Sequence, residues 1–385
     1  EYLEMTYRVI AMAALLGSAS TLHAGGIDRS GQSITALFES GRYAEFSLGS
    51  VSPNTSGVGV QATPGVKSGN MTDNFFTFGA AYKADINDQL SYAIIYDQPF
   101  GADVAYDTGT GYFAAGSTAT FDSDALTALL RYKTPNNFSV HGGIRVQRIE
   151  ASALIPFVTA APNPNNPFIT NPGAPYSVKG DQETGVGYVA GVAYEKPEIA
   201  MRVSLTYNSK ISYDVDTTEN SALGMGVKST TEVDTPQSLN LEFQTGIAAD
   251  TLLFGGVRWT DWSSFEIAPQ QYATLTRGGK LLSYDDDVYS YSLGVGRRLN
   301  DTWSVAASIG YEKSEGGFSS NLGPTDGNKS LALAATYSRD NVKITTGIRY
   351  INIGDAETEA GLASPAATFE DNDAVAIGVK VGFTF

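Results

Sequence analysis

The chain has 385 residues, of which 42% are hydrophobic, and a mean hydropathy of −0.12, so its length allows one large domain or up to three ordinary ones. No run of eighteen apolar residues follows the first thirty positions, which excludes a helical membrane protein. Cysteine is absent, which removes disulfides and thiolate chemistry, and a net charge of −16 argues against a nucleic-acid partner because phosphates require a cationic face.

The first residues predict a secretory signal peptide. Arg8 precedes an apolar stretch at residues 9–16, and small residues follow as far as Ala24. A cationic start, a short apolar stretch and a small-residue exit are the parts of such a signal. We assign residues 1–24 to the signal and to sequence upstream of it, with a short buried helix as the alternative.

The rest of the chain repeats an alternation of apolar residues with small or polar ones. In one segment, Val203 and Leu205 alternate with Arg202 and Ser204. Such segments exceed the roughly five to six residues common in globular sheets and match the roughly nine to eleven that a tilted strand needs to cross a bilayer. Fourteen occur, at residues 43–51, 73–84, 89–99, 119–133, 138–150, 185–195, 199–215, 236–248, 251–267, 286–299, 302–313, 328–338, 341–353 and 373–385.

The connections between these segments alternate in length. Six are short, and seven are long, near residues 52–72, 100–118, 151–184, 216–235, 268–285, 314–327 and 354–372. Strict alternation is typical of an up-and-down barrel with short periplasmic turns and long outer loops. We therefore predict an all-β fold, a 14-stranded antiparallel transmembrane β-barrel in the outer membrane of a Gram-negative bacterium.

The last segment has the same pattern. Val375, Ile377 and Val379 lie on one edge, and Ala376 and Gly378 on the other. We expect this strand to close the barrel against the first one, because closure leaves no unpaired backbone in lipid. The final Phe385 also resembles the C-terminal signature that the outer-membrane assembly machinery recognises.

Residues 82–106, 194–211, 252–267 and 287–311 resemble, in order, the FadL/TodX family of outer-membrane transporters for long-chain fatty acids and other hydrophobic compounds. The resemblance implies a monomeric 14-stranded barrel, here residues 43–385, plugged by a short N-terminal hatch, here residues 25–42. The family's hatch usually carries an Asn-Pro-Ala motif. This chain lacks it and has Ile34, Leu37 and Phe38 in that region.

A conduit for fatty acids needs an apolar entrance, since burial of each CH₂ stabilises by about 0.8 kcal/mol. The third long loop carries six prolines and several apolar side chains within residues 153–176. We predict that it forms the entrance, although contact with lipopolysaccharide or packing within the loop is the alternative. The candidate entrance residues are Leu154, Ile155, Phe157, Phe168 and Ile169.

A ligand carboxylate needs a cation. If the small and polar edges of the strands face inward, several cations point into the lumen, where any of them could pair with a carboxylate. The alternative is that they pair with wall carboxylates such as Glu242. The candidates are Arg145, Arg202, Lys210, Arg258, Arg298, Arg349 and Lys380.

The third strand carries Pro99, Phe100 and Gly101. Proline removes a ladder hydrogen bond and glycine weakens a strand, so these residues are expected to interrupt it. In the family that the chain resembles, such a kink lets ligand leave sideways into the membrane. The alternative is that the three residues mark the end of the strand.

Enzymatic function has little support. A serine, histidine and acid arrangement needs an imidazole, and His141 is the one histidine after residue 24. No phosphate-binding glycine loop or metal cluster is evident in the sequence. We predict passive, binding-coupled diffusion of long-chain fatty acids or similar hydrophobic molecules, with no cofactor and with outer-membrane lipids as neighbours. The alternative is a general diffusion porin, which predicts a charged constriction loop and a trimer.

Overall fold

The computed structural model describes residues 27–385 apart from 62, 159, 164–165, 173 and 360–364, and describes residues 160–172 by their backbone alone. The predicted signal and the first two residues of the predicted hatch lie outside this range. Within it, no helix is long and apolar enough to cross a bilayer.

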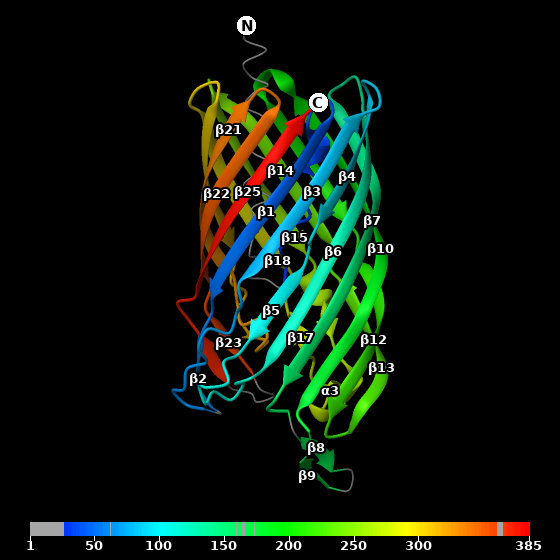
Figure 1. Ribbon diagram of the computed structural model, residues 1–385, viewed down its shortest axis with the longest axis vertical. Helices are drawn as coiled ribbons and strands as arrows, with labels where there is room; N and C mark the ends of the chain where they lie inside the picture. The colour runs from blue at the N-terminus through cyan, green and yellow to red at the C-terminus, as the bar shows by residue number, and fades with distance from the viewer. Residues whose placement is uncertain (1–26, 62, 159, 164–165, 173, 360–364) are drawn as a thin grey trace.

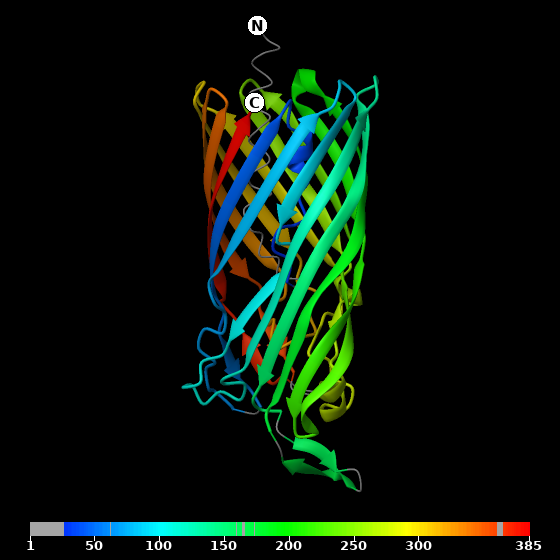
Figure 2. The ribbon, with the colours of Figure 1, turned by 45° about the vertical axis from the view of Figure 1, so that its right-hand side comes forward.

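The wall is one closed antiparallel sheet of tilted strands (Figures 1 and 2). Its seventeen strand segments include three interrupted strands (β4 with β5, β11 with β12, β13 with β14), so the barrel has the fourteen strands that the sequence predicts. The wall segments are β1 (Tyr43–Asn54), β3 (Phe75–Asp85), β4 (Leu90–Asp97), β5 (Gly101–Ala105), β6 (Thr118–Lys133), β7 (Phe138–Ile155), β10 (Tyr176–Lys196), β11 (Met201–Asn208), β12 (Ile211–Ser221), β13 (Gly224–Thr235), β14 (Ser238–Ala248), β15 (Thr251–Thr260), β18 (Val288–Arg298), β19 (Trp303–Glu312), β21 (Asn328–Arg339), β22 (Val342–Ile353) and β25 (Asp373–Thr384).

The remaining elements lie in the connections and in the lumen. Two of them, β8 and β9, form a hairpin that projects beyond the wall (Figure 1). Another four form a small separate sheet in the order β2, β24, β23, β20. The full set is η2 (Thr35–Phe38), β2 (Gly57–Gly59), β8 (Ala160–Asn163), β9 (Asn166–Pro172), η3 (Pro197–Ile199), η4 (Trp262–Ser264), β16 (Glu266–Ile267), α3 (Gln270–Leu275), β17 (Leu282–Ser283), β20 (Phe318–Ser319), β23 (Ala356–Thr358) and β24 (Ala367–Phe369).

Strand β25 closes the barrel by pairing with β1 from Tyr43↔Thr384 to Asn54↔Asp373. The barrel is apolar outside and polar inside, the reverse of a water-soluble protein. On β25, Ile377 is 56% exposed on the outer face, whereas Lys380 is buried on the inner face. This sidedness suits a wall that faces hydrocarbon.

The two rims differ. The short turns gather at the rim where the chain ends, which we call the short-turn rim (Figure 1). Aromatic pairs mark it, such as Tyr82 with Tyr92 at 6.2 Å and Trp303 with Tyr337 at 5.2 Å between ring centroids. Rings at this level fit the interfacial belt of a membrane barrel. The opposite edge, with the long connections, is the long-loop rim.

Two predicted loops are partly strand. Residues 216–235, expected to be a loop, form the end of β12 and all of β13, joined by a tight turn at 222–223. The loop expected at 151–184 is shorter, because β7 runs on to Ile155 and β10 begins at Tyr176. These extensions project from the long-loop rim, beyond the part of the wall whose outer face is apolar. The alternation of apolar and polar residues that identifies the membrane-spanning strands is therefore absent from them.

Strands β11 and β12 face opposite ways. On β11 the even positions, such as Ser204 and Thr206, are buried in the lumen, whereas on β12 the odd positions Ile211 and Tyr213 are buried. Ser209 and the residue after it belong to neither strand. This irregularity shifts the phase by one residue, and a one-residue shift exchanges the two faces of everything beyond it.

Candidate functional site

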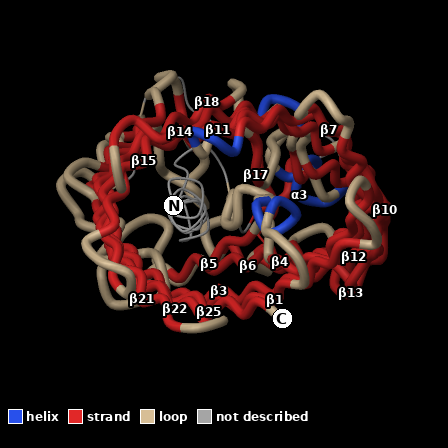
Figure 3. The backbone as a smooth tube through the Cα atoms, turned by 90° about the horizontal axis from the view of Figure 1, so that it is seen from above, coloured by secondary structure: helices blue, strands red, loops and turns tan. Residues whose placement is uncertain are grey.

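Residues 27–42 run inside the closed ring of wall strands that Figure 3 shows from above, on the short-turn side (Figure 2). Ile34 and Leu37 are almost fully buried, and they pack against wall residues including Leu129. The ring of Phe38 lies under two guanidinium groups, with Arg131 Cζ 4.6 Å and Arg202 Cζ 4.5 Å from its centroid. Cation–π contacts of this kind, shielded from water, hold the segment to two sides of the wall.

An ion pair fixes the start of this luminal segment. The Arg258 Nε on β15 donates to Asp28 Oδ2 at 2.8 Å, and Nη2 lies 2.7 Å from the same oxygen. Arg258 also donates through Nη1 to Ser238 and to Asn240, at 2.9 and 2.7 Å. Both charges are buried, so each depends on the other for its solvation.

The wall lacks strand pairing where the third strand is interrupted. Strand β3 pairs with β4 from Ala80↔Tyr96 to Asp85↔Ser91, but β5 pairs with β6 and has no register with β3. The chain between β4 and β5 bonds to the luminal segment instead. Pro99 O accepts from Arg29 N at 2.7 Å, and Gly101 N donates to Ile27 O at 2.8 Å. The unpaired backbone at this break is thus satisfied from inside the barrel.

Arg29 fills the break. Its Nη2 lies 2.6 Å from Asp103 Oδ2 on β5, and its Cζ lies 4.2 Å from the ring centroid of Phe75 on β3. It therefore bridges the two strands that do not pair. A Cβ on Gly101 would come within 2.2 Å of the Arg29 Cζ, so glycine leaves the space that the guanidinium occupies.

A cavity of about 70 Å³ lies behind the break. Its lining combines the luminal segment, from Arg29 to Ala36, with β1, β3 and the last residues of β4, including Asp97. We call it the break cavity. It brings hatch and wall together at the point where the sheet is unpaired.

A second cavity, the apolar pocket, lies between the inner faces of β5, β6, β7, β10, β12 and β13 and the loop that follows β15. Ile149, Val178, Val215 and Leu282 contribute aliphatic side chains to it. Its free volume is about 60 Å³, and a few water molecules would fill such a space. A longer ligand therefore has to displace the loop that covers the pocket.

That covering loop, residues 261–287, is anchored at two places. Glu219, fully buried on β12, accepts hydrogen bonds from the backbone N–H groups of Gln271 and Tyr272 at the start of α3. Asp287 accepts from Ser263 and from Trp259 Nε1. Burial raises the pKa of Asp287, but the hydrogen bonds from these two residues outweigh burial and hold the pKa below its ordinary value.

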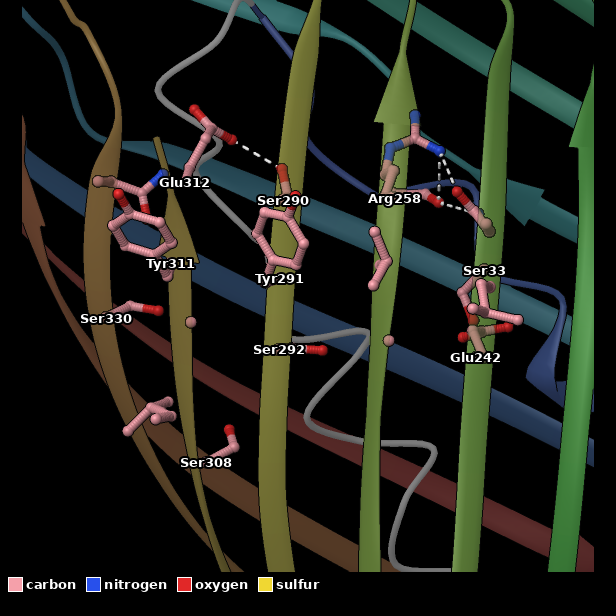
Figure 4. A pocket seen from close by; sticks show the side chains of 18 of the residues that line it. Ser33, Glu242, Arg258, Ser290, Tyr291, Ser292, Ser308, Tyr311, Glu312 and Ser330 are labelled. Atoms are coloured by element: carbon pink, nitrogen blue, oxygen red, sulfur yellow. Dashed lines mark hydrogen bonds between the residues drawn. The ribbon is translucent and has the colours of Figure 1, made fainter. Parts of the chain in front are cut away.

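The opposite half of the lumen holds a polar cavity of about 120 Å³ (Figure 4). Ser290, Ser292 and Ser308 line it from β18 and β19, and Ser290 donates to Glu312 at 2.7 Å. Its composition suits water and small polar solutes rather than an alkyl chain. The barrel therefore contains an apolar half and a polar half.

Most of the predicted cations face inward and have partners. Arg145 Nε donates to Thr127 at 2.9 Å and Nη1 to Asn208 at 3.1 Å. Arg298 pairs with Asp250 at the short-turn rim, 2.6 Å away. The inward-facing set is Arg145, Arg202, Arg258, Arg298, Arg349 and Lys380, of which Lys380 lies 3.3 Å from Glu45.

The prediction that Lys210 points into the lumen is wrong. Its side chain is 47% exposed and pairs at 2.6 Å with Asp234, which lies on the outer face of β13. The phase shift at Ser209 turns this part of the chain around, so the polar edge that faces inward on β11 faces outward beyond it.

The predicted entrance residues lie in three different places rather than in one loop. Leu154 and Ile155 are the last residues of β7, not loop residues, and Leu154 faces outward whereas Ile155 is buried inside. Phe157 follows the strand and packs edge-on against Phe113 at 5.5 Å. Phe168 and Ile169 belong to β9, and their side chains lie outside the described part of the structure.

Several residues of these sites were not predicted. Asp28 and Arg29 precede the first strand, in a stretch without periodicity, and Glu219 lies in a segment expected to be a loop. The available signal was two adjacent charged residues, Asp28 and Arg29, in a segment expected to lie inside the barrel, since buried charges are normally paired. Trp262 on η4 was not predicted either, and it is buried near the apolar pocket.

Comparisons with known proteins agree with this geometry. The family model described as outer membrane protein transport protein (OMPP1/FadL/TodX) matches residues 31–385. A Pseudomonas aeruginosa FadL homologue has a similar structure, with a TM-score of 0.76, 15% identity and 96% and 97% of the two chains covered. The Ralstonia pickettii toluene transporter TbuX gives 0.62, 13% identity and 91% of each chain. The Pseudomonas putida toluene transporter TodX gives 0.63, 12% identity, and 94% and 97%. No curated protein sequence matches.

Proposed function

Because this chain belongs to the OMPP1/FadL/TodX family of outer-membrane transport proteins, we propose that it conducts long-chain fatty acids or similar hydrophobic molecules from its apolar pocket to the break in its wall. The family transports hydrophobic compounds across the outer membrane, and this chain is one of its outer-membrane β-barrels.

The observation that carries the proposal is the position of the apolar pocket. It lies within the lumen beside β5 and β6, and these two strands also border the break in the wall. Burial of apolar ligand surface against Ile149 and Val215 supplies the affinity. The polar cavity in the other half of the lumen is lined by serine hydroxyls and by charged groups such as Glu242 and Arg258, which argues against an alkyl chain crossing there.

The break supports a sideways exit. Its backbone groups bond to the luminal segment, so a movement of that segment would open the wall without unfolding the barrel. A hydrophobic molecule that leaves through the wall enters lipid and never crosses water. The relatives named as toluene transporters support a role for small apolar ligands as well as long ones.

Substitution of Thr77, which lines the break cavity from β3, tests the route. Thr77→Trp should fill the break cavity and lower the uptake of a hydrophobic tracer into cells or proteoliposomes. The matched control is Ser292→Trp, which places the same ring in the polar cavity. If the control blocks uptake and Thr77→Trp does not, the route is axial and the sideways exit is wrong.

We also propose that residues 27–42 act as the hatch. The wall closes between β1 and β25 without them, so deletion of residues 27–40 should leave a folded barrel with raised permeability. The deletion spares Arg42, whose carbonyl accepts from Phe385 N at 2.9 Å. Unchanged ligand affinity and unchanged ion conductance in the deletion variant would remove this assignment.

A further inference from the structure

One row of the inner wall contains buried polar atoms without partners. In the described part of the structure, neither amide atom of Gln147 has a hydrogen-bond partner, although the residue is only 1% exposed. The Tyr213 hydroxyl and Asp97 Oδ1 also have none among the described residues. Buried polar groups are normally satisfied, so an unsatisfied set calls for an explanation such as a ligand.

Strand register places these groups side by side. Asp97 pairs with Ala125, Ala125 with Gln147, and Gln147 with Gly185. The row therefore runs across β4, β6, β7 and β10, with about 10 Å between Asp97 and Gln147 at two strand spacings.

Tyr213 completes the row from β12. A Cβ on Gly185 would lie 2.8 Å from Tyr213 Cε1, so the tyrosine ring covers that glycine, next to Gln147. The Tyr213 hydroxyl lies near the Gln147 amide and Thr235 without reaching hydrogen-bond geometry with either.

The row connects the two cavities. At one end, Gln147 and Tyr213 each stand two residues from a residue that lines the apolar pocket, Ile149 and Val215 respectively. At the other end, Asp97 is the last residue of β4 and lines the break cavity. The row therefore lies between the apolar pocket and the break cavity.

The chemistry of the row favours an uncharged head group. Gln147 offers an NH₂ group that donates and a carbonyl oxygen that accepts, the Tyr213 hydroxyl can do both, and Asp97 Oδ1, as a carboxylate oxygen, only accepts. Arg145 lies in the neighbouring row and is close enough to Asp97 to interact electrostatically, so the two charges offset each other. A hydroxyl group can donate to Asp97 or to Gln147 Oε1, whereas a carboxylate can only accept.

We propose that Asp97, Gln147 and Tyr213 form a binding track for the uncharged hydroxyl head of an amphiphile, such as an alcohol or a phenol, whose apolar part occupies the apolar pocket. This inference rests on the proposed function, because it names the ligand class for the same passage. A hydrocarbon would leave the polar atoms unsatisfied, and the site discriminates against it on that ground.

The test compares three ligands of equal chain length, dodecanol, dodecane and dodecanoate. Each radiolabelled ligand is distributed between protein and lipid in nanodiscs, with empty nanodiscs as the blank. Wild-type protein should favour dodecanol over both others. Gln147→Met and Tyr213→Phe should each lower the dodecanol ratio, by about tenfold for one lost hydrogen bond of roughly 1.4 kcal/mol, and leave the dodecane ratio unchanged or raised.

The matched control is Gln244→Met. Gln244 is also a buried inward-facing glutamine whose Oε1 has no partner among the described residues, but its Nε2 donates to Ala200 O and it lies on β14, away from the row. It should not alter the preference among the ligands. Retained dodecane binding shows that a variant is folded. If Gln147→Met does not insert into nanodiscs as a folded barrel, Tyr213→Phe, which removes only the hydroxyl oxygen, tests the inference alone.

Two results would overturn the inference. One is equal loss of dodecanol and dodecane in the variants, and the other is a wild-type preference for dodecane or dodecanoate, in which case buried water satisfies the row. Failure of the wild-type protein to bind any of the three ligands would instead overturn the proposed function, and this inference with it.

Discussion

Arg258 and Asp28 are joined within the barrel by two contacts to one carboxylate oxygen, at 2.8 and 2.7 Å, across 230 positions of sequence. The pair ties the start of the luminal segment to β15, on the wall opposite the break. Because both side chains are buried, neither can be lost without leaving the other charge without its counterion.

The first prediction concerns this pair. Arg258→Met should destabilise the luminal segment by about 3–5 kcal/mol, the range for breaking a buried ion pair. The barrel wall should persist while single-channel conductance in planar bilayers rises. The control is Arg298→Met, whose partner Asp250 is 38% exposed at the short-turn rim. Equal conductance changes in both variants would show that the Arg258 pair does not hold the plug.

A second prediction concerns Gly101 and Arg29. Gly101→Ala should displace the guanidinium and break its contact with Asp103, because the new Cβ would lie 2.2 Å from the Arg29 Cζ. We expect the free energy of unfolding to fall by about 1–3 kcal/mol. The measurement is the temperature or urea concentration at which half of the folded barrel is lost on unheated SDS gels.

The same contact predicts strong coupling. Arg29→Ala should cost less in the Gly101→Ala background than in the wild type, since its pairing is already lost there. The double-mutant cycle measures this difference. Additive effects would mean that the two residues do not share the space that the structure assigns to them.

A third prediction concerns the cover of the apolar pocket. Glu219→Gln removes the negative charge that accepts from the backbone of α3, and hydrogen bonds to charged groups contribute about 1.5–3 kcal/mol each. The amides of Gln271 and Tyr272 should then exchange with deuterium at least tenfold faster. Glu232→Gln on the exposed face of β13 is the control and should leave both amides protected.

A fourth prediction concerns the oligomeric state, in which this protein should differ from a general porin. We expect the purified protein to run as a heat-modifiable monomer, because the outer face is apolar around the wall and matches lipid rather than a subunit interface. Sedimentation in a density-matched detergent measures the state directly. A stable trimer would favour the porin alternative.

The sequence predicts the wall well because lipid imposes a simple rule on it. Residues such as Leu293 and Val295 need to be apolar on the outside, and Gly294 small on the inside, so period-two alternation locates the strand. Above the bilayer that rule ends. Residues 224–235 have polar side chains on their outer face, such as Glu232, and were expected to be a loop for this reason.

The sites were predicted less well, because they depend on distant partners. The position of Arg258 on the polar edge of its strand predicted that it faces the lumen. Nothing in the sequence indicated that its partner would be Asp28 rather than a ligand. Gln147 gave no signal, since an inward glutamine has the same pattern whether or not its amide is satisfied. The prediction that Lys210 faces the lumen was wrong because the sequence does not reveal the extra residue at Ser209. Apolar residues stay at odd positions on both sides of it, although the inward face changes from even to odd positions.

The irregularity at Ser209 has a consequence for how the gene can vary. Substitutions there keep the phase of the strand, and the backbone of β12 continues with Ile211 inward. A single-codon deletion there would let regular alternation run from Asn208, which faces inward on β11, to Ile211, so both strands would keep their faces. A single-codon deletion within β12 would instead turn the residues on one side of it around. Natural length changes of one residue should therefore fall at positions 209–210, or near Pro236, where the adjoining strand is also interrupted, rather than within the strands.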